Sequence, residues 1–262
     1  MAMSMNYSGY LKLDQLLSLQ APVTEKPEHD EMLFIIVHQV YELWFKQMLH
    51  EFDHIRVLLE RNDTPPALHK LKRVLTILKI QVAQLDILET MTPLEFLSFR
   101  KTLESASGLE SYQFRELEFA LGVKRATHLD IFEKGSPTRE RLEARFRAPG
   151  LWDVFLGYLA REGYEIPQEV LERDYTQPNP TSPDVQRVLI DIYHNNPAIA
   201  QLNERFVDLD EGFQEWRYRH VKMTERTIGM KVGTGGTTGV SYLISTLFKP
   251  AFPDLWAIRA DL

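Results

Sequence analysis

The 262-residue sequence contains no cysteine, which excludes disulfide bonds, thiolate nucleophiles and thiolate metal ligands. Acidic residues outnumber basic ones by 37 to 30, and the net charge of −7 does not favour binding to nucleic acid or to an acidic membrane. No apolar run is long enough to span a membrane, and the first residues lack the pattern of a signal peptide. We therefore expect a cytoplasmic protein that binds neither nucleic acid nor membranes.

The sequence also lacks the alternating pattern of β-strands, internal repeats and low-complexity tracts. Apolar residues instead recur at helical spacing, most strongly over residues 31–62, 67–89 and 197–230. Shorter helices are expected at 92–103, 111–121, 138–147, 150–162, 167–173 and 239–248. "TPLE" at 92–95 has the spacing of a capping box. The sequence predicts an all-α protein in which residues 1–262 form a single domain, with 1–30 as an N-terminal arm.

A histidine interrupts the apolar face of the first long helix. In "EMLFIIVHQVYELWF", Phe34, His38, Tyr41 and Phe45 share one side. A second histidine repeats the feature, since His220 lies in the middle of an apolar face in "VDLDEGFQEWRYRHVKMTERTIGM". A hydrogen-bonded core histidine is the ordinary explanation for either one alone. Two of them among aromatic residues also suit an iron ligand and a hydrogen-bonding partner in an apolar pocket.

An arginine lies on a similar face in "PLEFLSFRKTL". Phe96 and Arg100 are four residues apart, so the guanidinium is directed toward the side that the aromatic residues occupy. The ordinary explanation is an arginine that extends to solvent or pairs with a carboxylate. The functional alternative is a planar group that binds a ligand carboxylate through two hydrogen bonds.

Two further patterns were considered as ligand sites. "GTGGTTG" at 233–239 is rich in backbone donors and could surround a polar ligand group, but it lacks the lysine of a phosphate-binding loop and follows no strand. His50 and His54 have the spacing of a metal-binding pair on a helix. The residues around this pair resemble the charged outer side of a helix, which favours a solvated surface.

The order of several segments resembles one known family, the tryptophan 2,3-dioxygenases. The matching segments are "YSGYLKLDQLL", "FIIVHQVYELW", "ILETMTPLEFLSFR", "SASG", "WRYRHV" and "GTGGTTG". Each is weak alone, but the six in the family's order are very specific. The resemblance implies a bundle of long helices around a buried haem pocket, and it covers nearly the whole chain.

The resemblance implies roles for the matching positions. His220 would be the axial ligand of haem b iron, with Gly108 bordering the haem. His38 would be the catalytic distal histidine, which accepts a hydrogen bond from the indole N–H and is buried by its contact with the indole. The other substrate contacts implied are Phe34, Phe96, Arg100, Ser107 and Thr234, together with Tyr7, Tyr10 and Leu11, which reach the pocket of a neighbouring subunit.

The implied activity is the insertion of both atoms of O₂ across the indole C2–C3 bond of L-tryptophan, giving N-formyl-L-kynurenine. This is the first step of tryptophan catabolism by the kynurenine pathway, and it requires ferrous haem. The implied assembly is a homotetramer, a dimer of dimers. Two alternatives are a haem sensor or carrier, which needs His220 but no amino-acid clamp, and a cofactor-free helical scaffold, which needs neither histidine.

Overall fold

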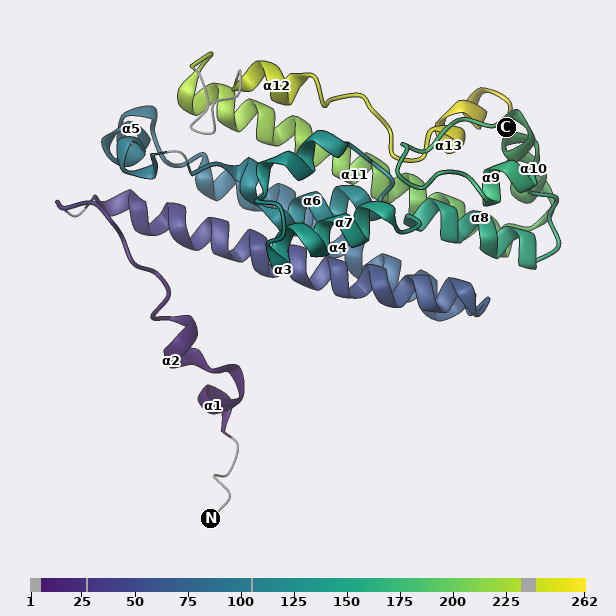
Figure 1. Cartoon of the computed structure of the whole chain (residues 1–262), viewed down its shortest axis with the longest axis horizontal. Coiled ribbons are helices and arrows are strands. Elements are labelled where there is room, and N and C mark those ends of the chain that lie inside the picture. The colour runs from purple at the N-terminus through teal and green to yellow at the C-terminus, as the bar shows by residue number, and fades with distance from the viewer. Residues whose placement is uncertain (1–5, 27, 105, 232–238) are drawn as a thin grey trace.

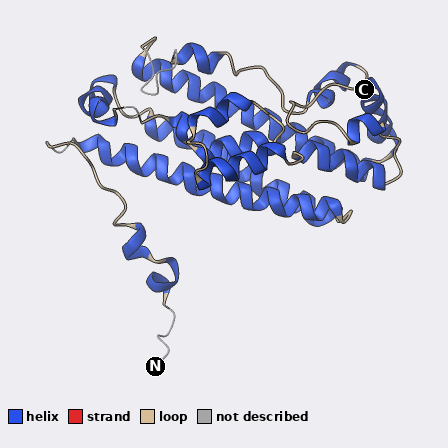
Figure 2. Ribbon diagram, viewed as in Figure 1, coloured by secondary structure: helices blue, strands red, loops and turns tan. Residues whose placement is uncertain are grey.

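The structure, a computed structural model, describes residues 6–26, 28–104, 106–231 and 239–262. Figure 1 shows an elongated body of long helices, from which the N-terminal arm extends away. Over the described residues the secondary structure consists of helices and connecting turns, with no strand (Figure 2). The all-α fold class predicted from the sequence is therefore confirmed.

Three long helices form the centre of the body, at nearly the positions that the apolar spacing predicts. They are α3 (His29–Glu60), α4 (Thr64–Leu88) and α11 (Pro197–Ile228). α4 packs extensively against both α3 and α11. At the crossing of α4 and α11 a side chain on Gly212 would place its Cβ 2.8 Å from Cδ2 of Leu78. The absence of a side chain at Gly212 therefore permits the close approach of these two helices.

Two short helices, α1 (Tyr7–Leu11) and α2 (Leu13–Leu16), lie on the N-terminal arm (Figure 1). Other shorter helices cover the centre. They are α5 (Pro93–Phe99), α6 (Tyr112–Ala120), α7 (Pro137–Arg147), α8 (Leu151–Arg161), α9 (Gln168–Leu171), α10 (Pro183–Asn195), α12 (Val240–Ile244) and α13 (Pro253–Ala257). Short 3₁₀ turns are η1 (Arg100–Leu103), η2 (Gly108–Glu110), η3 (Ala126–Ile131) and η4 (Ile258–Ala260). α6 and α8 pack on α3, whereas α10 and α13 pack on α11. Among the described helices, none combines the length and hydropathy needed to cross a membrane.

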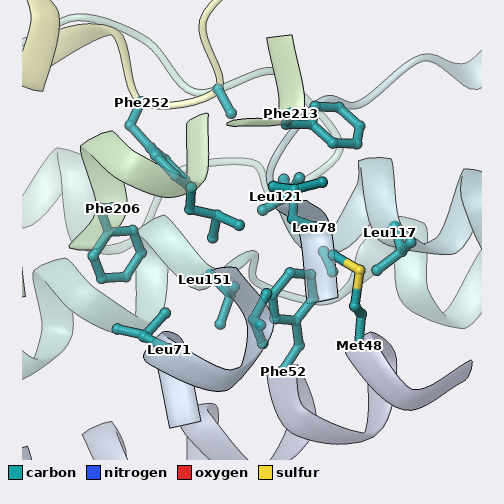
Figure 3. Close-up of a cluster of buried hydrophobic side chains, with 14 of the residues drawn as sticks. Met48, Phe52, Leu71, Leu78, Leu117, Leu121, Leu151, Phe206, Phe213 and Phe252 are labelled. Carbon is teal, nitrogen blue, oxygen red and sulfur yellow. The ribbon is translucent and has the colours of Figure 1, made fainter. Parts of the chain in front are cut away.

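The hydrophobic core lies where the long helices meet α6 and α8. In Figure 3, side chains from different helices converge, among them Phe52 of α3, Leu71 of α4 and Phe206 of α11. All three are fully buried. Burying a side chain of this size contributes about 1.5–3 kcal/mol each. The core therefore fixes the long helices firmly against one another.

The segment before the first 3₁₀ turn differs from the sequence prediction. The capping box is present, because Thr92 Oγ1 accepts from the Glu95 N–H at 3.3 Å and Glu95 Oε2 accepts from the Thr92 N–H at 2.7 Å. The α-helix nevertheless ends at Phe99, and residues 100–103 form η1. The predicted continuous helix over 92–103 is therefore wrong in its last turn, and Arg100 lies at the junction.

Candidate functional site

A cavity of ≈ 290 Å³ opens between α3, α5, α6, α11 and α12. Figure 1 shows α5 and α12 at the same end of the body, where α3 begins and α11 ends. Much of the lining is apolar and aromatic, including Phe45, Phe114 and Trp216. His38, Phe96, Arg100, Ser107, Gly108 and His220 also line it. Six residues singled out in the sequence, from four separate segments, therefore surround one space.

His220 is held near the end of α11 by a stacked aromatic neighbour. Its ring lies 5.1 Å from the Trp216 ring, with an angle of 4° between the planes. Burial, together with the smaller effects of the nearby His38 and Arg115, lowers the pKa of His220 to about 4. The imidazole is therefore neutral at pH 7, which is the form that can donate a lone pair to a metal. Because His220 already faces the cavity, α11 would not have to change shape for this residue to bind a metal.

His38 has a fixed orientation and a defined tautomer. Its Nδ1 lies 2.7 Å from the backbone oxygen of Phe34, and a carbonyl only accepts hydrogen bonds, so Nδ1 carries the hydrogen. The neutral ring then has its acceptor lone pair on Nε2. Burial lowers the pKa of His38, although the Phe34 oxygen and Glu42 oppose this. The arrangement provides a neutral hydrogen-bond acceptor beside the cavity.

In the single chain the residue keeps an exposed surface, because His38 borders the cavity instead of packing into the core, yet its ring is desolvated enough to lower its pKa. Its burial by a bound indole stays a prediction. Phe34 differs from expectation. It does not line the cavity but packs behind it, with its ring 4.1 Å from that of His38 and 5.8 Å from that of Phe96. Phe34 therefore supports the two residues that face the cavity.

The carboxylate-binding candidate, Arg100, is half-buried at the start of η1. Phe96, one helical turn earlier, lines the same cavity, as the spacing predicted. Ser107 and Gly108 enter from the next segment, where Ser107 Oγ accepts from the Leu109 N–H at 3.3 Å. A guanidinium, a hydroxyl group and an aromatic ring are therefore brought together on one side of the cavity.

Several predicted residues lie elsewhere. Tyr7, Tyr10 and Leu11 are exposed on the arm, away from this chain's own cavity. Thr234 lies outside the described residues. His50 and His54 are exposed, and the described residues contain no group of three or more side chains suited to a metal. The neighbouring Glu51 is buried instead of lying on a solvated face, because it pairs with Arg73 at 2.9 Å.

A charged cluster that the sequence pattern does not predict also borders the cavity. Arg115, Glu118 and Arg217 line it, and Glu118 pairs with both arginines. Burial alone would raise the pKa of Glu118, but the two arginines and His128 lower it to about 2. Arg115 and Glu118 are three residues apart in "FRELE", which is a visible signal of a helical ion pair. The contribution of Arg217 comes from α11 and has no local signal.

Comparison with known proteins gives a consistent set of similarities. A family described as tryptophan 2,3-dioxygenase matches residues 1–143 and 186–262. The tryptophan 2,3-dioxygenase of Herpetosiphon aurantiacus is 60% identical over 262 residues, the whole of both chains. That of Anaeromyxobacter sp. strain K is 54% identical over 259 residues, covering 99% of this chain and 97% of the relative. That of Serratia proteamaculans is 42% identical over 261 residues, covering 98% and 93%.

Proposed function

The chain belongs to the tryptophan 2,3-dioxygenase family, and from this premise we propose that its cavity is where L-tryptophan reacts with O₂. The reaction inserts both oxygen atoms across the indole C2–C3 bond and gives N-formyl-L-kynurenine, the first step of tryptophan catabolism by the kynurenine pathway. One observation carries the assignment of the site: His38, Arg100 and His220 all line the same cavity.

The residues around the cavity fit haem b as the cofactor. His220 is a neutral imidazole among apolar and aromatic side chains, and it would be the residue that holds the haem iron. One buried donor, Arg115 Nε, has no hydrogen-bond partner among the described residues. Arg115 Nε would suit a carboxylate substituent of the haem. When bound, ferrous haem supplies the binding and activation of O₂, while the protein positions the substrate.

The remaining side chains suit the two ends of the substrate. The guanidinium of Arg100 is proposed to bind the carboxylate, and Ser107 to contact the same polar end. The Nε2 lone pair of His38 would accept the indole N–H, with Phe96 against the aromatic ring. Both ends of the substrate are then held, which orients the C2–C3 bond before reaction. His38 acts here as a hydrogen-bond acceptor and not as a base. An indole N–H is a very weak acid, and a hydrogen bond to it requires no transfer of the proton.

The N-terminal arm supports a proposal about assembly. Tyr7 is 75% exposed and Tyr10 is 70% exposed, although both are aromatic. The arm extends away from the helical body that its own chain forms (Figure 1). We propose that Tyr7, Tyr10 and Leu11 contact the cavity of a neighbouring copy in a homotetramer. Light scattering of the full-length protein should then give four times the chain mass, and a monomer would contradict the proposal.

Turnover by the purified, haem-loaded protein tests the function. Reduced protein mixed with L-tryptophan and O₂ should show a Soret band and accumulate the absorbance of N-formylkynurenine. His50→Ala, which removes an exposed histidine from the same helix as His38, is the control and should turn over at the parent rate. A protein that binds haem and O₂ without forming this product would be a carrier or sensor, and the proposal would be wrong.

A further inference from the structure

Glu118 is the centre of a buried network, and the reaction proposed above gives no role to Glu118, His128 or Tyr242. Its side chain accepts hydrogen bonds from Arg115 Nη1 at 2.7 Å and from Arg217 Nη2 at 2.6 Å. The ring of His128, in η3, is also buried, and its Nδ1 lies 3.3 Å from Glu118 Oε2. The network therefore connects α6, α11 and η3 through one ionised carboxylate.

One branch of this network leads through His128 to Tyr242. An ionised carboxylate only accepts hydrogen bonds, so Nδ1 of His128 carries the hydrogen that points to Glu118. Arg115 Nη1 lies 3.3 Å and 3.5 Å from the two ring nitrogens. Nε2 lies 3.0 Å from the hydroxyl of Tyr242, within hydrogen-bond distance. The contacts of this branch therefore connect Glu118 through His128 to Tyr242.

The second branch reaches the same segment of the chain. Arg217 bonds Glu118 through Nη2, and its Nη1 donates to the backbone oxygen of Thr246 at 3.3 Å. Tyr242 and Thr246 stand at the two ends of a segment that also includes Leu243, and all three line the cavity. α12 has only five residues, too few to be stable as an isolated helix. Its position must therefore come from contacts such as these two.

We propose that Glu118 is a hub that positions residues 239–246 against the cavity, and that its branch through His128 to Tyr242 sets the affinity for the amino-acid substrate. His128 does not line the cavity, so its effect must be transmitted through Tyr242. The link to substrate rests on the proposed function, whereas the positioning of α12 does not. His128 and Tyr242 are positioning residues in this scheme and take no part in proton transfer.

Hydrogen exchange of the 240–247 peptide, followed by mass spectrometry on the full-length protein, tests the positioning directly. Tyr242→Phe removes one hydroxyl group, and His128→Leu removes the ring nitrogen that this hydroxyl contacts. Each should make exchange in this peptide about three- to tenfold faster, the change expected for one lost hydrogen bond. The double variant should exchange no faster than the singles, because both break the same link. Tyr193→Phe removes a hydroxyl bonded to Glu204 and should leave this peptide unchanged.

Substrate binding provides the second measurement. In Tyr242→Phe and His128→Leu, KM for L-tryptophan should rise about three- to tenfold, while kcat should stay within about twofold. The reason is that residues 239–246 move in these variants, whereas the groups that take part in the reaction do not. The proposed positioning role of Glu118 would be wrong if exchange is unchanged in the single variants, or if the double variant exchanges faster than either single variant. Its proposed role in substrate affinity would be wrong if kcat falls at unchanged KM. If the parent protein forms no N-formylkynurenine, the proposed function fails, while the exchange result still decides the hub.

Discussion

Replacing His38 with alanine tests the proposed contact between this residue and the indole N–H. Nδ1 is already held by the Phe34 oxygen at 2.7 Å, so Nε2 needs no reorientation to accept a hydrogen bond. One such bond to a neutral donor contributes about 0.5–1.5 kcal/mol, which is roughly a two- to twelvefold change in affinity. Haem should remain bound to His38→Ala, because its proposed ligand is His220. Turnover should fall without being abolished.

The assay is a spectral titration of the ferrous haem with two ligands. L-Tryptophan carries the indole N–H, whereas β-(3-benzothienyl)alanine has a slightly larger sulfur atom in its place and no hydrogen to donate. The parent should prefer L-tryptophan by about two- to twelvefold, and His38→Ala should bind both nearly equally. His50→Ala, on the same helix but exposed, should behave as the parent. An equal preference for L-tryptophan in parent and His38→Ala would refute the contact.

The same contact predicts a dependence on pH. The pKa of His38 is lowered by burial, so the ring stays neutral and able to accept down to below its ordinary value of 6.5. Protonation at lower pH converts Nε2 into a donor, which cannot accept the indole N–H. Affinity for L-tryptophan should therefore be constant from pH 8 to 6.5 and fall at more acid pH. The acid loss should be absent in His38→Ala, and its persistence there would assign the titration to another group.

Three more substitutions address the cofactor, the carboxylate and the buried carboxyl group. His220→Ala should lose or greatly weaken haem binding with a nearly unchanged helical circular dichroism spectrum; a stoichiometric, unaltered haem spectrum would contradict the assignment. Arg100→Leu should keep haem but lose about 2–5 kcal/mol of L-tryptophan binding in the same titration, with little rescue by Arg100→Lys; unchanged affinity would contradict the clamp. The pKa of Glu118 is about 2 in the folded protein, against an ordinary value of 4.5. Its ionised form therefore contributes about 3 kcal/mol to the free energy of unfolding, which is present above pH 4.5 and lost as the pH falls toward 2. Glu118→Gln should lack this contribution at pH 7 and show a flatter acid unfolding profile, and an unchanged profile would contradict it.

The parts of the fold that follow a strong helical period could be predicted from the sequence. α3, α4 and α11 lie where the apolar residues predicted them, because long amphipathic segments have few alternatives. α10 was missed, although Ser182 and Pro183 form a clear helix start and Ser182 Oγ accepts from the Val185 N–H. The preceding "QPNPTSP" is typical of a loop, and its last two residues are also the start of the helix.

The site was predictable where a polar residue interrupts an apolar face. His38, His220 and Arg100 stand out in this way, and all three line the cavity. The sequence does not predict the network of Glu118, His128 and Tyr242, because Tyr242 is 114 residues from His128 and no local pattern connects Glu118 with His128. Each alone resembles an ordinary surface residue. Only the packing of α6, η3 and α12 shows that a carboxylate, an imidazole and a phenol form one chain of hydrogen bonds.

The residues of the site lie on two kinds of element, long helices held in place by the core and short elements that depend on neighbouring contacts. His38 and His220 lie on the two long helices α3 and α11, whose positions are fixed by a core in which residues such as Phe52 are fully buried. The residues proposed for the polar end of the substrate lie on short elements, η1 and the segment before α6, which cannot be stable alone. α5, just before η1, is held by the capping box of Thr92. A substitution in the core should therefore change haem retention, whereas loss of this cap should change KM for L-tryptophan first.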